Sequence, residues 1–346
     1  MITLAALQIV WYVLLLFLLA MFVVLDGYDL GTGIWYLLAR RGQERTQLLT
    51  AIAPFWDGNQ VWLVTAGGAT FAAFPPLYAA LLSGLYPLLI ILLLALILRT
   101  VSVEYAQKEH RPRPRQVWDV IFGVSSTAAV VSLGLLLGNV LAGLPLDADG
   151  ELRFAFGAVF SPMALLVTIL LFLAVTLHGA IWIRLKTTGE VRRRARRWGR
   201  DTWIITFPLL IAAFAVLACN SPRLVANYVG MPALWAVPML ALLAVAVAGA
   251  AHLGERDAVA FAASSVSILL LFGSSAVALY PTLLPAQDPT LSLTAYNASA
   301  SHLALTAMLI TAILGLPVVI AYSAGVHWLF RERARPEAGS EYSNEA

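Results

Sequence analysis

Long apolar segments, separated by short polar or proline- and glycine-rich stretches, make up most of the chain between residues 4 and 329. Segments such as 4–25 and 79–98 are long enough to cross about 30 Å of hydrocarbon. We therefore predict an all-α fold of about nine membrane-spanning helices. The predicted spans cover residues 8–37, 50–73, 78–98, 117–141, 160–183, 203–219, 233–251, 259–280 and 303–329.

Composition supports a polytopic membrane protein. Of 346 residues, 60% are hydrophobic and only 12% are charged, whereas a soluble domain averages about 25% charged residues. The first span has no Lys or Arg before it, so we interpret it as a true span and not as a cleaved signal peptide. Cys219 is the only cysteine, which excludes an internal disulfide and a cysteine-based metal cluster.

Basic residues predict the orientation of the spans. The segments that follow spans 1, 3, 5, 7 and 9 hold 20 of the 22 Lys and Arg residues, and the other two are Arg153 and Arg223. These segments all fall on one side, which the positive-inside rule makes the cytoplasm. The N-terminus is then outside and the C-terminus inside. Residues 1–330 form one transmembrane domain, and residues 331–346 form a polar tail that we expect to be disordered.

The sequence "RRRARRWGR" at 192–200 is the strongest concentration of positive charge in the chain. We predict that it lies in a cytoplasmic loop, where it sets the topology and contacts anionic lipid. This explanation accounts for the whole run, so we expect no nucleic-acid partner.

Three carboxylates are predicted to lie inside the spans. Asp26 and Asp29 belong to "LDGYDLGTG" in span 1, and their spacing places them on one helix face. Glycines in the same segment could let another helix backbone approach closely. Asp57 lies about seven residues into span 2, at a depth of roughly 10 Å.

Carboxylates at staggered depths on neighbouring helices are a recurring feature of proton paths in membrane proteins. We therefore interpret Asp57 and Asp26 as proton-path or cofactor-site residues, with Asp29 as a further candidate. The alternative is structural. Asp57 could cap the start of span 2, since Asp is a favoured N-cap, and Asp29 could pair with a cation from a partner.

Other polar residues stand close to these carboxylates. Asn59 and Gln60 could hydrogen-bond a carboxylate or bridge two helices. Arg99 and Glu104 flank the end of span 3, where they could organise the same proton entrance. We favour the simpler interpretation that both are snorkelling interface residues.

The histidines argue against a haem held wholly by this chain. His178 is the only one near the middle of a predicted span, and a bis-histidine haem would need a second ligand at similar depth. A haem with one histidine ligand remains an alternative. We expect His178 to be a hydrogen-bonding residue in the core or at an interface.

The motifs together resemble the second subunit of cytochrome bd-type quinol oxidases, including the cyanide-insensitive variants. The resemblance is strong over roughly residues 1–200 and weaker but collinear afterwards. It is carried by the sequences "LDGYDLGTG", "APFWDGNQVWLVTAGGATFAAFPPLYAAL", "LGNVLAGLPL", "LKTTGEVRRRARR" and "YPTLLP".

The resemblance implies a fold of two four-helix bundles plus one peripheral helix, in a bacterial inner membrane. It also implies a complex that oxidises quinol and reduces dioxygen to water. Haem b and haem d would belong to the partner, the haem-bearing subunit I. This chain would support that subunit and line a cytoplasmic proton path. Small single-helix accessory subunits and a structural quinone are further implied possibilities.

The resemblance assigns roles to individual residues. Asp57 and Asp26 carry over as proton-path residues, and Asp29 is assigned less firmly. Trp56 and Arg99 lie in matching segments and would face the haem-bearing partner, and we expect Asn59, Gln60 and Glu104 to belong to the same interface.

Two other functions remain open from the residues alone. A proton-coupled secondary transporter would use Asp26 and Asp57 as coupling sites and would work without a partner, although we detect no related halves. A structural membrane scaffold would give the same carboxylates no part in proton transfer. An oxidase subunit should co-purify with a haem-containing partner, which separates it from the transporter.

Overall fold

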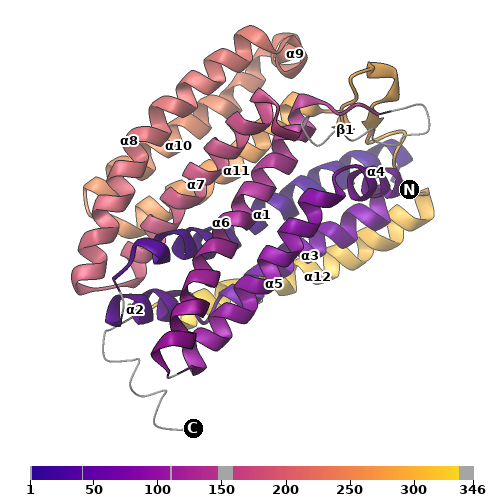
Figure 1. The fold of residues 1–346 in the computed structure, drawn as a ribbon. Coiled ribbons are helices and arrows are strands. Elements are labelled where there is room, and N and C mark those ends of the chain that lie inside the picture. Colours follow the sequence, from indigo (N-terminus) through magenta and orange to yellow (C-terminus); the bar gives the residue numbers. More distant parts are fainter. Residues whose placement is uncertain (1, 41, 110, 147–158, 335–346) are drawn as a thin grey trace.

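The structure is a computed structural model that describes residues 2–40, 42–109, 111–146 and 159–334. Within them, each predicted span overlaps one long helix, which confirms the all-α fold (Figure 1). Eight of these helices are long and apolar enough to cross a membrane, and the remaining one, α3, has 18 residues but a less apolar sequence that begins with polar side chains. The nine are α1 (Leu4–Leu38), α3 (Trp56–Ala73), α5 (Tyr86–Lys108), α6 (Pro112–Ala142), α7 (Pro162–Lys186), α8 (Gly189–Asn220), α10 (Ala236–Leu253), α11 (Asp257–Leu279) and α12 (His302–Leu329).

Short elements connect these helices at the two ends of the bundle. Helix α2 (Gln43–Ile52) precedes α3, and α4 (Pro75–Gly84) follows it. Beyond α8, α9 (Pro222–Gly230) leads into the 3-10 helix η2 (Pro232–Trp235). Between α11 and α12, the strands β1 (Thr282–Leu284) and β2 (Leu293–Thr294) pair antiparallel around the 3-10 helix η3 (Pro289–Leu291).

Two predicted boundaries differ from the structure near prolines. The predicted span 50–73 is divided, because α2 ends at Ile52, a turn containing Pro54 follows, and α3 begins at Trp56. Proline lacks a backbone N–H and fits the start of a helix better than its interior. The predicted span 78–98 is divided in the same way, with Pro87 in the first turn of α5.

The arginine-rich run 192–200 is helical, so the prediction of a loop there is wrong. It forms the early turns of α8, which continues without a break into the apolar segment. Arginine and alanine are good helix formers. Arg193 also pairs with Glu190 three residues earlier, at 2.6 Å.

The long helices form two groups of four. In the first group, α1 contacts α3 and α6, and α6 contacts α5. In the second group, α7 and α10 each contact both α8 and α11. Contacts of α1 and α6 with α7 join the groups. Helix α12 lies at the periphery beside α1 and α3, with only Leu305 buried along its length, in agreement with the predicted peripheral helix (Figure 1).

Helix α1 is the centre of the molecule. All residues from Phe22 to Tyr36 are buried. Where α1 crosses α7, Gly31 faces Gly179, and a Cβ on Gly31 would overlap the carbonyl oxygen of Val175. Glycine is therefore required at this crossing, and the close approach predicted for the glycines of "LDGYDLGTG" is confirmed here.

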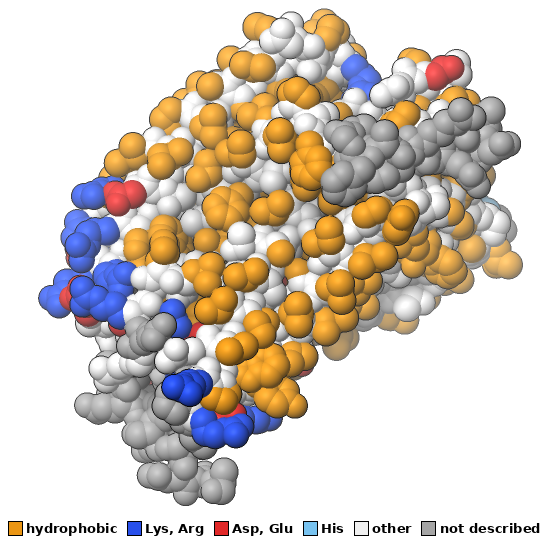
Figure 2. Space-filling view, in the orientation of Figure 1, with side chains coloured by type: hydrophobic (Ala, Val, Ile, Leu, Met, Phe, Trp, Pro, Cys, Tyr) orange, Lys and Arg blue, Asp and Glu red, His pale blue; other side chains and the backbone are white. Residues whose placement is uncertain are grey.

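Charge divides the molecule into two ends. We call the end formed by the C-terminal ends of α1, α5, α7, α10 and α12 the basic end, because Lys and Arg side chains gather there (Figure 2). Among the described Lys and Arg residues, Arg223 in α9 is the exception at the opposite end. Arg153 and residues 335–346, the larger part of the predicted disordered tail, lie outside the described residues.

Candidate functional site

The centre of the first group holds a buried ion pair between α1 and α5. Arg99 Nη2 lies 2.7 Å from Asp26 Oδ1, and the two side chains are 1% and 0% exposed. The interpretation of Arg99 as a snorkelling residue is therefore wrong, because its guanidinium turns inward to compensate a carboxylate that has no access to water. Removing one partner of such a pair leaves an uncompensated buried charge, which is strongly destabilising.

Gln60 of α3 completes the surroundings of Arg99. With its amide oxygen turned toward the guanidinium, Gln60 accepts a hydrogen bond from Arg99 Nε at 3.3 Å, and its nitrogen donates to Thr100 Oγ1 at 3.2 Å. The arginine therefore links all three helices α1, α3 and α5 at one point.

Asn59 of α3 gathers a second set of polar groups one turn along α1. Its Nδ2 lies 2.8 Å from Asp29 Oδ2, 2.7 Å from the Tyr28 hydroxyl and 3.1 Å from the Leu25 carbonyl oxygen. An amide nitrogen carries only two hydrogens, so these three acceptors share them. Asp29 is paired with an amide from its own chain, and no partner cation is needed to explain its position.

The two buried carboxylates each keep one oxygen without a hydrogen-bond partner among the described residues, Oδ2 of Asp26 and Oδ1 of Asp29. Nearly all buried polar atoms in native proteins are hydrogen-bonded. A carboxylate oxygen without a donor can accept a proton, so the site has two places at which a proton could be held.

Asp57 does not join this cluster. It is the second residue of α3, and its side chain is exposed on the surface of the chain. It does not cap the helix, because Phe55 occupies the N-cap position and makes no side-chain cap bond. A carboxylate in the first turn still complements the helix dipole. The preceding Trp56 is buried in the core, with 8% of its surface exposed.

Glu104 also lies apart from the buried cluster. It is on the surface of α5 and pairs with Lys108 one turn later, at 2.9 Å. Its exposed position agrees with the prediction that Glu104 lies at the membrane interface. The structure thus brings together Asp26, Asp29, Asn59, Gln60 and Arg99, and it leaves Asp57 and Glu104 on the surface.

Two members of the cluster were missed in the sequence. The Tyr28 hydroxyl lies 2.9 Å from His327 Nε2, and the Tyr28 ring stacks on Trp182 with 3.9 Å between ring centroids. A tyrosine between two aspartates in a predicted span was the available signal for Tyr28. His327 gave no such signal, because it is 299 residues away in the sequence.

His178 is a hydrogen-bonded core residue, as predicted. Its Nδ1 lies 2.8 Å from Ser264 Oγ on α11, and its Nε2 lies 2.9 Å from the Val24 carbonyl oxygen on α1. Both ring nitrogens are thus occupied, which does not fit an axial haem ligand. Within the described residues, no three His, Cys, Asp or Glu side chains are placed to hold a metal ion.

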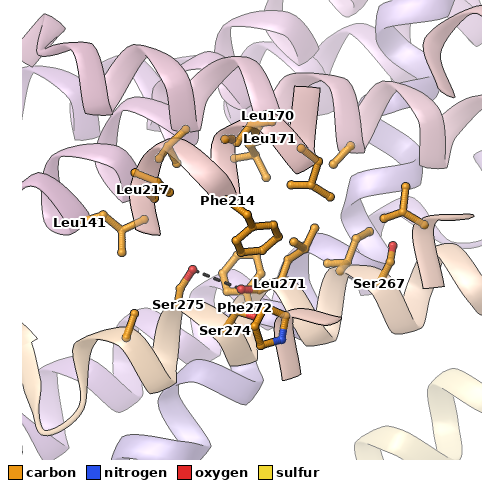
Figure 3. Close-up of a pocket in the computed structure, with 18 of the residues that line it drawn as sticks. Leu141, Leu170, Leu171, Phe214, Leu217, Ser267, Leu271, Phe272, Ser274 and Ser275 are labelled. Atoms are coloured by element: carbon orange, nitrogen blue, oxygen red, sulfur yellow. Dashed lines mark hydrogen bonds between the residues drawn. The ribbon is translucent and has the colours of Figure 1, made fainter. Parts of the chain in front are cut away.

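The second group of helices contains a cavity of about 180 Å³ (Figure 3). Leu170 and Leu171 of α7, Phe214 of α8 and Leu271 of α11 contribute to its apolar lining. Serines of α11 also reach it, but several of their hydroxyls bond to their own helix, as Ser275 does to the Leu271 carbonyl oxygen at 3.2 Å. The cavity can therefore hold an apolar molecule but offers it few polar contacts.

Comparison with known proteins places these features in a family. The family model for cytochrome bd terminal oxidase subunit II matches residues 7–330. The chain is 33% identical to the probable cytochrome oxidase subunit 2 of Haemophilus influenzae, with 92% of each protein covered. It is 30% identical to cytochrome bd-I ubiquinol oxidase subunit 2 of Escherichia coli, with 95% of each covered.

Two further comparisons agree. The chain is 30% identical to cytochrome bd ubiquinol oxidase subunit 2 of Bacillus subtilis, covering 95% of this chain and 97% of that protein. In fold it is similar to a chain in the structure of bd oxidase from Geobacillus thermodenitrificans, with a TM-score of 0.78. That match covers 94% of this chain and 98% of the other, at 19% sequence identity.

Proposed function

Because the chain belongs to the family of cytochrome bd terminal oxidase subunit II, we propose that its buried carboxylates lie on a proton route toward the haem-bearing subunit. The family makes this chain a multi-pass membrane subunit of a quinol oxidase, a respiratory oxidoreductase complex that contains haem and in which subunit I is the partner. The complex oxidises quinol and reduces dioxygen to water, and the second of these reactions consumes protons.

One observation carries the proposal, the cluster of Asp26 and Asp29 at the centre of an apolar bundle. Intramembrane carboxylates are costly, and those that persist in membrane proteins commonly serve proton or ion transfer. Each of these two keeps one oxygen without a partner among the described residues. Arg99 and Asn59 fix the other oxygens, so a proton received at Asp26 or Asp29 would be held at a defined atom.

The haems are proposed to lie wholly in the partner. When bound there, haem b and haem d supply the electron transfer and the oxygen chemistry. His178 supports this division because hydrogen bonds occupy both of its ring nitrogens. The residues of this chain then have two tasks, to hold or move protons and to present a surface to subunit I.

We propose that the partner covers the exposed face of α3. Asp57 and Gly58 begin this face, and Val61, Val64 and Phe71 continue it with 51%, 74% and 60% of their surfaces exposed. A carboxylate on such a surface would lie against lipid in the isolated chain, which costs about 3 kcal/mol at the bilayer centre and less toward the ends of the helices, where Asp57 lies. A partner that brings water or a cation to Asp57 removes that cost and places it between the two subunits.

The basic end is proposed to face the cytoplasm, with the N-terminus outside and the C-terminus inside. The positive-inside rule supports this orientation. Protons would then enter from the basic end, where α3 begins with Trp56 and Asp57 and where Glu104 lies on α5.

The cavity between α7, α8 and α11 is the proposed position of a structural quinone. Its lining is almost entirely apolar, which suits an isoprenoid chain better than a polar headgroup. The role would be structural, because within the described residues the cavity lining includes neither Asp26 nor Asp29.

A scaffold without proton transfer is the competing function, and the Asp26–Arg99 ion pair favours it because such a pair can serve assembly alone. The test uses Asp29→Asn and Asp57→Asn in the co-expressed complex, with Asp201→Asn as the control on an exposed residue. We expect full haem content with quinol-driven oxygen consumption per haem reduced by about tenfold or more. Normal haem and normal turnover in both variants would contradict the proton route. Loss of haem with normal turnover per remaining haem would support the scaffold.

A further inference from the structure

The peripheral helix α12 reaches the buried cluster through His327. Most of α12 is exposed, yet its end reaches the Tyr28 hydroxyl, which belongs to the buried part of α1. The His327 ring also packs against Phe55, with 4.6 Å between ring centroids. A helix that buries little else thus places a titratable ring beside the proposed proton site.

Hydrogen-bond directions in this contact follow from the atoms involved. His327 Nδ1 lies 2.8 Å from the Ser323 carbonyl oxygen, which can only accept, so Nδ1 carries the hydrogen. In the neutral ring, Nε2 is then an acceptor, and the Tyr28 hydroxyl donates to it over 2.9 Å. The Tyr28 oxygen in turn accepts from Asn59, whose two amide hydrogens are shared among Tyr28, Asp29 and the Leu25 carbonyl oxygen.

The chain after α12 holds this histidine in place. We call residues 330–334 the strap. Lys186 of α7 donates to the Phe330 carbonyl oxygen, and the Ala334 N–H donates to the Lys186 carbonyl oxygen at 2.7 Å. Gln47 of α2 donates to the Ala334 carbonyl oxygen at 2.8 Å. The strap thus ties the end of α12 to α2 and α7, which fixes His327 relative to Tyr28.

We propose that His327 is a positioning residue for proton transfer at Asp29. By accepting the Tyr28 hydrogen, it leaves the Tyr28 oxygen free to accept from Asn59, and Asn59 is thereby held on Asp29 Oδ2. Oδ1 of Asp29, which has no hydrogen-bond partner among the described residues, is then held in one orientation for the proposed proton transfer. This inference rests on the proposed function, because it assigns His327 to the same carboxylate.

The arrangement has a consequence for pH. A doubly protonated His327 has no acceptor nitrogen, so its Nε2 would have to donate a hydrogen to Tyr28 instead of accepting one. The hydrogen bonds from Asn59 through Tyr28 to His327 would then no longer run in one direction. The groups that face His327 from the helices packed around it are Tyr28 of α1 and Lys186 of α7, and the titratable group at this end of α3 is Asp57. Turnover of the wild-type complex should therefore fall on the acid side as His327 becomes charged.

The test compares His327→Gln and His327→Ala in the intact, co-expressed complex. Glutamine offers an uncharged acceptor oxygen to Tyr28, whereas alanine offers none. We expect His327→Ala to lower oxygen consumption per haem on the order of tenfold, and His327→Gln to keep most of the turnover and to lack the acid-side fall. His302→Gln, at the exposed opposite end of α12, is the matched control and should behave as the wild type.

Tyr28→Phe keeps the proposal falsifiable if the alanine variant does not assemble, since it removes only the hydroxyl. A glutamine variant as slow as the alanine variant, or normal turnover in Tyr28→Phe, would overturn the role of His327. Asp29→Asn is measured in parallel. Normal turnover there and in Asp57→Asn would overturn the proposed proton route itself, whereas slow Asp29→Asn with normal His327→Ala would overturn only the present inference.

Discussion

The centres of the two groups of helices differ in what they enclose. In the first group, α1, α3 and α5 enclose the Asp26–Arg99 ion pair and the amide of Asn59. In the second group, α7, α8 and α11 enclose a cavity, and serine hydroxyls there bond largely to their own helices. Near the middle of the bundle, charge is thus found where three helices supply partners for it, and the cavity lies where the lining holds no charged side chain. The second group also pairs buried charges, Arg184 of α7 with Asp257 of α11, but at the basic end and not at the cavity.

The two groups can therefore contribute to an oxidase subunit in two different ways. A cluster of charges in a closely packed group can hold a proton at a defined atom. An apolar cavity cannot do so, but it can hold an apolar molecule without competing for that proton. Helix α1 borders both, since Asp26 belongs to the first and Val23 lines the second.

The largest expected effect comes from breaking the ion pair. Arg99→Met should leave Asp26 unpaired in the interior, at a cost of about 3 to 5 kcal/mol. We expect severe loss of assembled complex, measured as haem per purified complex and as the midpoint of thermal unfolding. Arg200→Met, in an exposed pair with Asp201 on α8, should cost no more than about 1 kcal/mol.

The double variant Asp26→Asn with Arg99→Met decides whether charge compensation is the reason. Removing both charges should restore part of the assembly that Arg99→Met loses, although turnover should stay low if Asp26 lies on the proton route. Equal losses in the single and double variants would mean that shape, and not charge, governs this site.

The second-largest effect is expected at the crossing of α1 and α7, which joins the two groups of helices. Gly179→Ala would place a Cβ 2.5 Å from the Gly31 carbonyl carbon, so α1 and α7 would have to separate. We expect a loss of about 1 to 3 kcal/mol, seen as a lower midpoint of thermal unfolding of the complex. Gly273→Ala on α11 is the control, because its nearest neighbour would be Val237 Cγ1 at an ordinary 3.6 Å. Equal midpoints for the two variants would contradict a required glycine at the crossing.

The sequence predicted the apolar helices well, because each span carries its own signal. It predicted their ends less well where prolines intervene, as at Pro54, and where arginines continue a helix beyond the apolar segment, as in α8. Helix propensity and proline geometry decide those ends, and hydropathy does not report them.

The candidate site could be predicted from the sequence only in part. Asp26 and Asp29 could be singled out because a carboxylate in an apolar helix is costly. Their partners could not be assigned, since Arg99 is 73 residues away from Asp26 and looked like an ordinary residue at a span end. For Asp57 the predicted depth was wrong. The predicted span 50–73 began before the turn that precedes α3, so Asp57 was placed about seven residues inside a helix of which it is the second residue.

The smallest expected effect comes from filling the cavity of the second group. Ala213 is buried on α8 and lines the cavity, so Ala213→Leu should occupy part of its volume without disturbing a charge. We expect turnover per haem to stay within about twofold of the wild type, because additional carbon atoms here have room and touch no proton-holding group. Quinone that co-purifies with the complex, extracted and quantified, should fall. Ala212→Leu, exposed on the outer side of the same helix, is the matched control and should leave that quinone unchanged. If Ala213→Leu instead slows turnover as much as Asp29→Asn does, the two groups are not independent, and the cavity takes part in the reaction that the buried carboxylates serve.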